Sequence, residues 1–131
     1  MKYFFQKNRY DCGAACVAII LSHFNVKEEL LTITQKCRTS TKGTTLYDMK
    51  RVLFQYGVKF KGYECTENDF KNLTLPLIAQ IEAFENTNHF VILNSITMDR
   101  IELFCPVEGF RTISKHDFLD EWTGKVLMST L

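Results

Sequence analysis

The sequence predicts an α+β domain in which helices come first and an antiparallel sheet follows. Apolar residues up to position 57 recur at helical spacing, whereas from residue 58 onward they alternate with polar residues or form short runs between turn residues. Such a separation of helices from strands is typical of α+β folds. The chain has 131 residues, 46% of them hydrophobic, which is enough for one core but not for two. We therefore expect a single domain over residues 1–131.

Three helices are expected in the N-terminal part of the chain. Residues 11–24 combine small and apolar side chains with an acidic residue at the start, a pattern that predicts a buried helix. Residues 27–37 and 44–56 each place apolar side chains on one helical face, and Gly57 is a stop signal. The polar segment 38–43, rich in Ser and Thr, is expected to form a surface loop between them.

Short apolar runs bounded by turn residues predict strands in the rest of the chain. These runs cover residues 58–60, 75–81, 90–96, 101–104 and 125–128. One more short helix is expected over residues 114–122, with Ser114 as its N-cap.

The composition excludes several classes of function. Charged residues make up 24% of the chain and the net charge is only +1, so no broad basic field exists to bind nucleic acid. The longest apolar stretch, residues 14–21, is too short to cross a bilayer. Five cysteines at irregular positions do not match a disulfide framework, and no second Cys/His pair at zinc spacing follows Cys12 and Cys16. We expect reduced thiols in the cytosol, with no metal and no cofactor.

Cys12 is the candidate nucleophile. It falls in the expected first turn of helix 11–24, where unpaired N–H groups and the helix dipole favour a thiolate. Gly13 and Ala14 are expected to leave the backbone beside it open to a substrate. A purely structural role as a buried apolar thiol is the alternative for Cys12. That structural role is the preferred interpretation of three other cysteines: Cys16, Cys37 and Cys65.

His89 is the candidate general base, because a thiol nucleophile needs an imidazole supplied by another element of the fold. It opens the apolar run 90–93, so we expect it at a strand end close to a helix N-terminus. His23 lies about three helical turns beyond Cys12, and His116 lies in a charged surface segment. Spacing alone leaves a surface or core role for His89 open.

Three motifs resemble those of one enzyme family. Residues 6–16 (QKNRYDCGAAC) resemble the active-site motif of the bacteriocin-processing cysteine peptidases, which are the N-terminal domains of peptidase-containing ABC transporters. Residues 89–93 (HFVIL) resemble their histidine motif, and residues 118–124 resemble their closing segment. The motifs occur in the same order as in that family, and the likeness covers nearly the whole chain.

The resemblance implies a papain-like fold with Cys12 as nucleophile, His89 as base and Gln6 as a side-chain donor to the oxyanion. The family pattern continues with an Asp followed by Pro, at a position where this chain has Cys105 and Pro106. Cys105 is therefore the expected residue at the position that orients the imidazole, in place of a carboxylate. Three nearby carboxylates remain open as alternatives: Asp99, Glu102 and Glu108.

The resemblance also implies a substrate and a setting. We expect a thiol-dependent endopeptidase that cuts bacteriocin, lantibiotic or competence-type precursors after a double-glycine leader, coupled to export. Its partners are then the precursor peptide and the transmembrane and ATP-binding domains of the same exporter, on the cytoplasmic side of a bacterial membrane. Residues 1–131 are then the N-terminal domain of that exporter. Exposed aromatic residues such as Tyr47 or Phe70 are candidates for binding the leader helix.

Two other functions fit the same fold. One is a degenerate domain that binds a leader without cutting it, an alternative that Cys105 favours mildly. The other is a thiol acyltransferase, in which the acyl group passes to an acceptor other than water.

Overall fold

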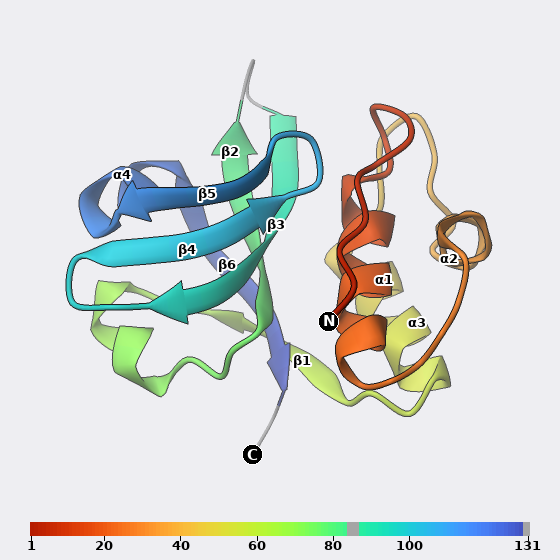
Figure 1. The fold of residues 1–131 in the computed structure, drawn as a ribbon, viewed down its shortest axis with the longest axis horizontal. Coiled ribbons are helices and arrows are strands. Elements are labelled where there is room, and N and C mark those ends of the chain that lie inside the picture. Colours follow the sequence, from red (N-terminus) through yellow and green to blue (C-terminus); the bar gives the residue numbers. More distant parts are fainter. Residues whose placement is uncertain (84–86, 130–131) are drawn as a thin grey trace.

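The computed structural model describes residues 1–83 and 87–129. Three helices from the N-terminal part pack on one face of a six-stranded sheet, and shorter helical segments cover the other face (Figure 1). All pairs of neighbouring strands are antiparallel. The predicted α+β architecture is confirmed.

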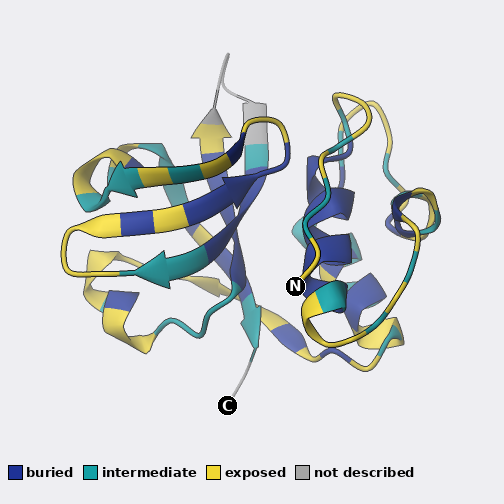
Figure 2. Ribbon diagram, viewed as in Figure 1, coloured by how far each residue is buried: buried dark blue, intermediate teal, exposed yellow. Residues whose placement is uncertain are grey.

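The helical layer is built around a buried first helix. Its members are α1 (Cys12–His23), α2 (Leu30–Lys36) and α3 (Leu46–Gln55). Every residue of α1 from Cys12 to Leu21 is buried (Figure 2), and burial of a side chain such as Ile19 contributes about 1.5–3 kcal/mol. Among the described residues, no helix has the length and apolar composition to cross a membrane.

The sheet has the strand order β1-β6-β2-β3-β4-β5. Its strands are β1 (Phe60–Glu64), β2 (Leu77–Ala83), β3 (Thr87–Ile96), β4 (Arg100–Cys105), β5 (Gly109–Ser114) and β6 (Trp122–Ser129). Two further helical segments accompany it, the 3-10 helix η1 (Glu67–Asn72) and the α-helix α4 (Lys115–Glu121). The side chains of β3 alternate between the two faces, because successive residues of a strand point in opposite directions.

Each face of the sheet has its own core. Phe90 and Ile92 of β3 pack with the helical layer, whereas Val91 and Leu93 pack on the opposite face. Cys105 belongs to that opposite face. The strand that begins near His89 therefore connects the two cores.

Several boundaries differ from those predicted. Strand β5 is absent from the prediction because it is an edge strand with an exposed Phe110 and polar neighbours, so it lacks an apolar run. The 3-10 helix η1 was also missed, although Thr66 and Asp69 form a capping box at its start. The predicted helix 114–122 ends one residue early because Trp122 begins β6. Ser114 caps α4 as predicted, accepting a hydrogen bond from the backbone of Asp117.

Gly124 in β6 provides a test of this packing. Its φ is +91°, and an added Cβ would lie 2.8 Å from the backbone oxygen of Cys65. Gly57 has a similar φ of +83° but open space around it. We expect Gly124→Ala to lower the free energy of unfolding by about 2–4 kcal/mol and Gly57→Ala by only about 1 kcal/mol, as measured by urea denaturation. Equal losses of unfolding free energy for the two variants would show that the backbone at Cys65 can move aside without a free-energy penalty.

Candidate active site

Cys12 is the first residue of α1 and is only 7% exposed. Backbone hydrogen bonds from Phe90 and Gly13 favour its thiolate, but burial outweighs them and raises the pKa of Cys12 above its ordinary value of 9.0. The prediction that the helix N-terminus lowers this pKa is therefore wrong in its net direction. In the resting protein Cys12 is a neutral thiol at pH 7.

Gly13 and Ala14 are buried, so the prediction that they leave the backbone open is also wrong. An added Cβ on Gly13 would lie 3.1 Å from Sδ of Met49, 3.1 Å from Cβ of Thr44 and 3.6 Å from the ring of Phe90. The small residue after Cys12 thus allows α3 and β3 to approach the first turn of α1. Gly13 therefore serves close packing beside the candidate nucleophile Cys12.

His89 lies near the start of β3, next to Phe90, whose backbone contacts the Cys12 thiol. It is half-buried, and burial lowers its pKa below the ordinary value of 6.5, with the charge of Glu108 acting in the opposite direction. The imidazole is therefore neutral at pH 7, as a base must be. In the described part of the chain no hydrogen bond joins Cys12 to His89, and the two segments meet at Phe90, whose backbone hydrogen-bonds the Cys12 thiol.

The other two histidines lie elsewhere, as predicted. His23 is the exposed last residue of α1. The side chain of His116 is 85% exposed on α4, where it lies close to the carboxylates of Asp117 and Asp120. These three residues place possible ligand atoms within 4.8 Å of one another, but on open surface and without a buried donor.

Cys105 contacts the imidazole directly. Its Sγ lies 3.6 Å from Nε2 of His89, and the residue is only 2% exposed at the end of β4. Of the three carboxylates left open by the sequence, Glu108 is the one whose charge acts on His89. It is exposed in the turn between β4 and β5, whereas Asp99 lies in the hairpin at the other end of β4. Cys105 is thus the contacting residue, and Glu108 acts on His89 only through its charge.

Gln6 reaches the same region through the N-terminal segment. Its backbone N–H donates to the carbonyl oxygen of Pro106 at 3.0 Å, directly after Cys105. The side-chain Nε2 donates to the carbonyl oxygen of Asn8 at 2.9 Å, and Oε1 is buried without a hydrogen-bond partner among the described residues. The structure therefore brings Gln6 beside the Cys105 segment, with its amide turned toward the loop that leads to Cys12.

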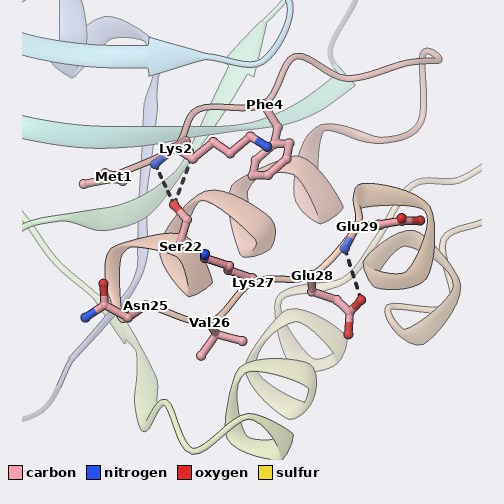
Figure 3. Close-up of a pocket in the computed structure, with 9 residues that line it drawn as sticks. All are labelled: Met1, Lys2, Phe4, Ser22, Asn25, Val26, Lys27, Glu28 and Glu29. Carbon is pink, nitrogen blue, oxygen red and sulfur yellow. Dashed lines mark hydrogen bonds between the residues drawn. The ribbon is translucent and has the colours of Figure 1, made fainter.

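The segment before Gln6 is held between α1 and the sheet (Figure 1). Ser22 Oγ accepts from the backbone N–H of Lys2 at 2.8 Å and donates to its carbonyl oxygen at 3.0 Å (Figure 3). The hydroxyl of Tyr3 donates to Oδ1 of Asn94 in β3 at 3.0 Å. A pocket of about 600 Å³ lies beside Ser22, but it is about 15 Å along α1 from Cys12, and no cysteine or histidine lines it.

The two aromatic residues proposed to bind a leader have different environments. Phe70 is only 8% exposed and packs against Phe118 and Trp122, so its predicted exposure is wrong. Tyr47 is 71% exposed and lines a groove of about 500 Å³ between α3 and β1, together with Phe54. The other residues lining this groove are Lys50, Arg51, Lys59, Phe60 and Lys61.

Comparison with known proteins places this arrangement in a family. A model described as "Peptidase C39 family" matches residues 1–130. The chain is 27% identical to the lactococcin-G-processing and transport ATP-binding protein LagD of Lactococcus lactis subsp. lactis, over 96% of this chain and 18% of that protein. It is 30% identical to the probable functional amyloid protease FapD of Pseudomonas fluorescens, over 92% of this chain and 57% of that protein. The chain thus spans less than two thirds of either relative.

Solved structures agree in fold. A double glycine motif protease from an AMS/PCAT transporter, solved in complex with the leader peptide, matches with a TM-score of 0.90 and 25% identity, over 98% of this chain and 91% of that one. The peptidase domain of Streptococcus ComA matches with a TM-score of 0.90 and 21% identity, over 97% and 96%. The papain-like fold and the resemblance seen in the motifs are both confirmed, and the chain belongs to the peptidase C39 family.

Proposed function

We propose that this chain is a cysteine endopeptidase that removes leader peptides after a double-glycine motif. One observation carries the proposal: an imidazole held by Cys105 at 3.6 Å lies next to Phe90, whose backbone contacts the thiol of Cys12. The thiol and the imidazole come from residues 77 positions apart in the sequence, and their meeting at Phe90 supports the proposed roles of nucleophile and base. The solved protease bound to a leader peptide supports the substrate class.

The setting is part of the same proposal. LagD is described as both a processing and an ATP-binding protein, which supports a chain that works beside transmembrane and ATP-binding domains on the cytoplasmic side of the membrane. Residues 1–131 then act as the N-terminal peptidase domain of an exporter. The likeness to FapD supports the proteolytic chemistry independently of any transporter.

The proposed reaction begins from two neutral groups, because burial disfavours both the Cys12 thiolate and the His89 imidazolium. As the sulfur attacks the glycine carbonyl, His89 takes the thiol proton. The negative charge that forms on the carbonyl oxygen is stabilised by the side chain of Gln6 and the backbone N–H of Cys12. His89 then gives its proton to the leaving amine, and water hydrolyses the thioester with His89 again as the base.

Cys105 gives this site an unusual orienting group. A thiol forms only weak hydrogen bonds, so Cys105 can hold the imidazole but lacks the carboxylate that the family pattern has at this position. The partner at Nε2 of His89 is also buried, which keeps water from competing for that nitrogen. We propose that the site works without a contacting carboxylate.

The groove between α3 and β1 is the proposed contact for the leader helix. Tyr47 and Phe54 are exposed by 71% and 65% and lie seven residues apart on α3, so they share one helical face. Lysines surround them, and none of the described residues that line the groove is acidic. Such a surface suits an amphipathic leader helix with apolar residues on one face and acidic residues beside them.

The first experiment incubates the protein with a double-glycine precursor peptide and weighs the products by mass spectrometry. We expect cleavage after the second glycine, and no cleavage by Cys12→Ala, which should still bind the peptide because a methyl group fills most of the thiol's place. Binding without products from the wild-type chain would favour the degenerate alternative. A product extended by an added amine, in place of a free carboxylate, would favour the acyltransferase.

The protonation states predict a slow alkylation of Cys12 at acid pH. Burial raises the pKa of this thiol above 9.0. The rate of its reaction with iodoacetamide should therefore rise steadily with pH, and should not already have reached its maximum below about pH 6. The partly exposed Cys65 is an internal standard on the same chain. Rapid acid labelling of Cys12, as a thiolate–imidazolium pair gives, would contradict the neutral resting state.

Substitutions at position 105 distinguish the effect of orienting the His89 imidazole from the effect of a negative charge beside it. Cys105→Asp places a carboxylate beside His89 and should raise the imidazole pKa by about one unit or more, so the acidic limb of the kcat/KM profile moves to higher pH. Turnover above that limb should rise. Cys105→Asn has nearly the same size but no charge, and should leave the limb in place, while Cys105→Ala should keep most of the activity. If the Asp variant leaves the limb unmoved, Glu108 already sets the charge around His89.

A further inference from the structure

The chain between Gln6 and α1 contains a turn built around Asn8. The carbonyl oxygen of Asn8 accepts two hydrogen bonds, from the backbone N–H of Asp11 at 3.3 Å and from Nε2 of Gln6 at 2.9 Å. The side-chain Oδ1 of Asn8 accepts a third, from the backbone N–H of Tyr10 at 3.0 Å. Asn is favoured at the first position of such turns, because its side chain can bond two residues ahead. One residue thus links Gln6 to Asp11, the residue directly before Cys12.

The bond to Asn8 sets the direction of the Gln6 amide. The backbone of Gln6 is fixed by Pro106, but its side-chain torsions need a separate anchor. Oε1 of Gln6 has no partner among the described residues, so the oxygen side of the amide supplies no such anchor. Nε2 carries two N–H groups, and the one bonded to Asn8 leaves the other available. The contact with Asn8 therefore decides where the second N–H points.

Resting on the proposed function, in which Gln6 donates to the oxyanion, we propose that Asn8 is a positioning residue for that donor. Its side chain closes the turn, the turn directs the carbonyl of Asn8 at Nε2, and the second N–H of Gln6 is thereby aimed at the reacting carbonyl. An oxyanion donor is effective when its direction is set before the charge develops. Loss of the turn should therefore slow the chemical step and leave leader binding unchanged.

The position is well suited to a mutational test. Asn8 is exposed, so its replacement removes no buried packing. Asp keeps an accepting oxygen at the same place, whereas Ala removes it. Arg9 is exposed in the same turn and provides a matched control, because its replacement removes a side chain but none of the three hydrogen bonds to Asn8.

The experiment measures kcat and KM on a synthetic peptide with a double-glycine leader and a short mature segment. Asn8→Ala should lower kcat roughly tenfold and change KM by less than about twofold. Asn8→Asp and Arg9→Ala should retain most of the wild-type turnover. Gln6→Ala should lower kcat by about two to three orders of magnitude. In the double variant, Asn8→Ala should add no further loss, because the two residues act as one unit.

Different outcomes overturn different claims. If the losses from Asn8→Ala and Gln6→Ala multiply in the double variant, Asn8 does not act through Gln6 and the inference fails, while the role of Gln6 stands. If Asn8→Asp is as slow as Asn8→Ala at an unchanged melting temperature, the accepting oxygen is irrelevant and the inference also fails. Full turnover in Gln6→Ala would remove the oxyanion assignment itself, and this inference with it.

Discussion

The close packing of the first turn of α1 against α3 and β3 determines where the candidate nucleophile lies. A Cβ on Gly13 would lie only 3.1 Å from Met49 and Thr44 and 3.6 Å from Phe90, so the backbone beside Cys12 is closely packed by both layers. The next eight residues of α1 are almost fully buried. A protein interior packed to this density resists small displacements. The position of the thiol is therefore a property of the whole core, and the N-terminal segment and the Cys105 segment are arranged around it.

The same burial sets the chemistry of the proposed site. It raises the pKa of the Cys12 thiol and lowers the pKa of the His89 imidazole, so both shifts favour the uncharged pair. A carboxylate on Nε2 of His89 would oppose this by stabilising imidazolium, but the residue that contacts this nitrogen is Cys105. When the resting site is uncharged, the free energy needed to separate charge adds to the barrier of the reaction. Donors that stabilise the oxyanion, for which we propose Gln6, then matter more than they would beside a preformed ion pair.

Much of this arrangement is predictable from sequence because its signals are local. The small and apolar run after Asp11 predicts α1, the apolar run after His89 predicts β3, and Ser114 predicts the start of α4. The 3-10 helix η1 was missed despite its local capping box, but other features that escaped prediction depend on contacts between distant segments. An edge strand such as β5 needs no apolar run, because its exposed face is solvated and β4 provides its pairing.

The proposed site shows the same division. Its residue types can be identified from three motifs, whereas the net direction of the Cys12 pKa shift depends on burial by β3 and α3, which no local pattern contains. Gly13 looked like an opening for substrate because its neighbours in space, Thr44 and Met49, lie more than thirty residues away in the sequence. Phe70 looked exposed because the aromatic side chains that cover it, Phe118 and Trp122, come about fifty residues later.

The neutral resting pair is the central claim, and the titration of His89 by NMR tests it most directly. The imidazole signals of the wild-type protein and of Cys12→Ala are followed across pH, with the exposed His116 as reference. The neutral pair predicts a His89 pKa below 6.5 that stays nearly unchanged when the thiol is removed. A pKa above 6.5 that falls in Cys12→Ala would show that a thiolate stabilises the imidazolium in the resting protein, and would contradict the claim.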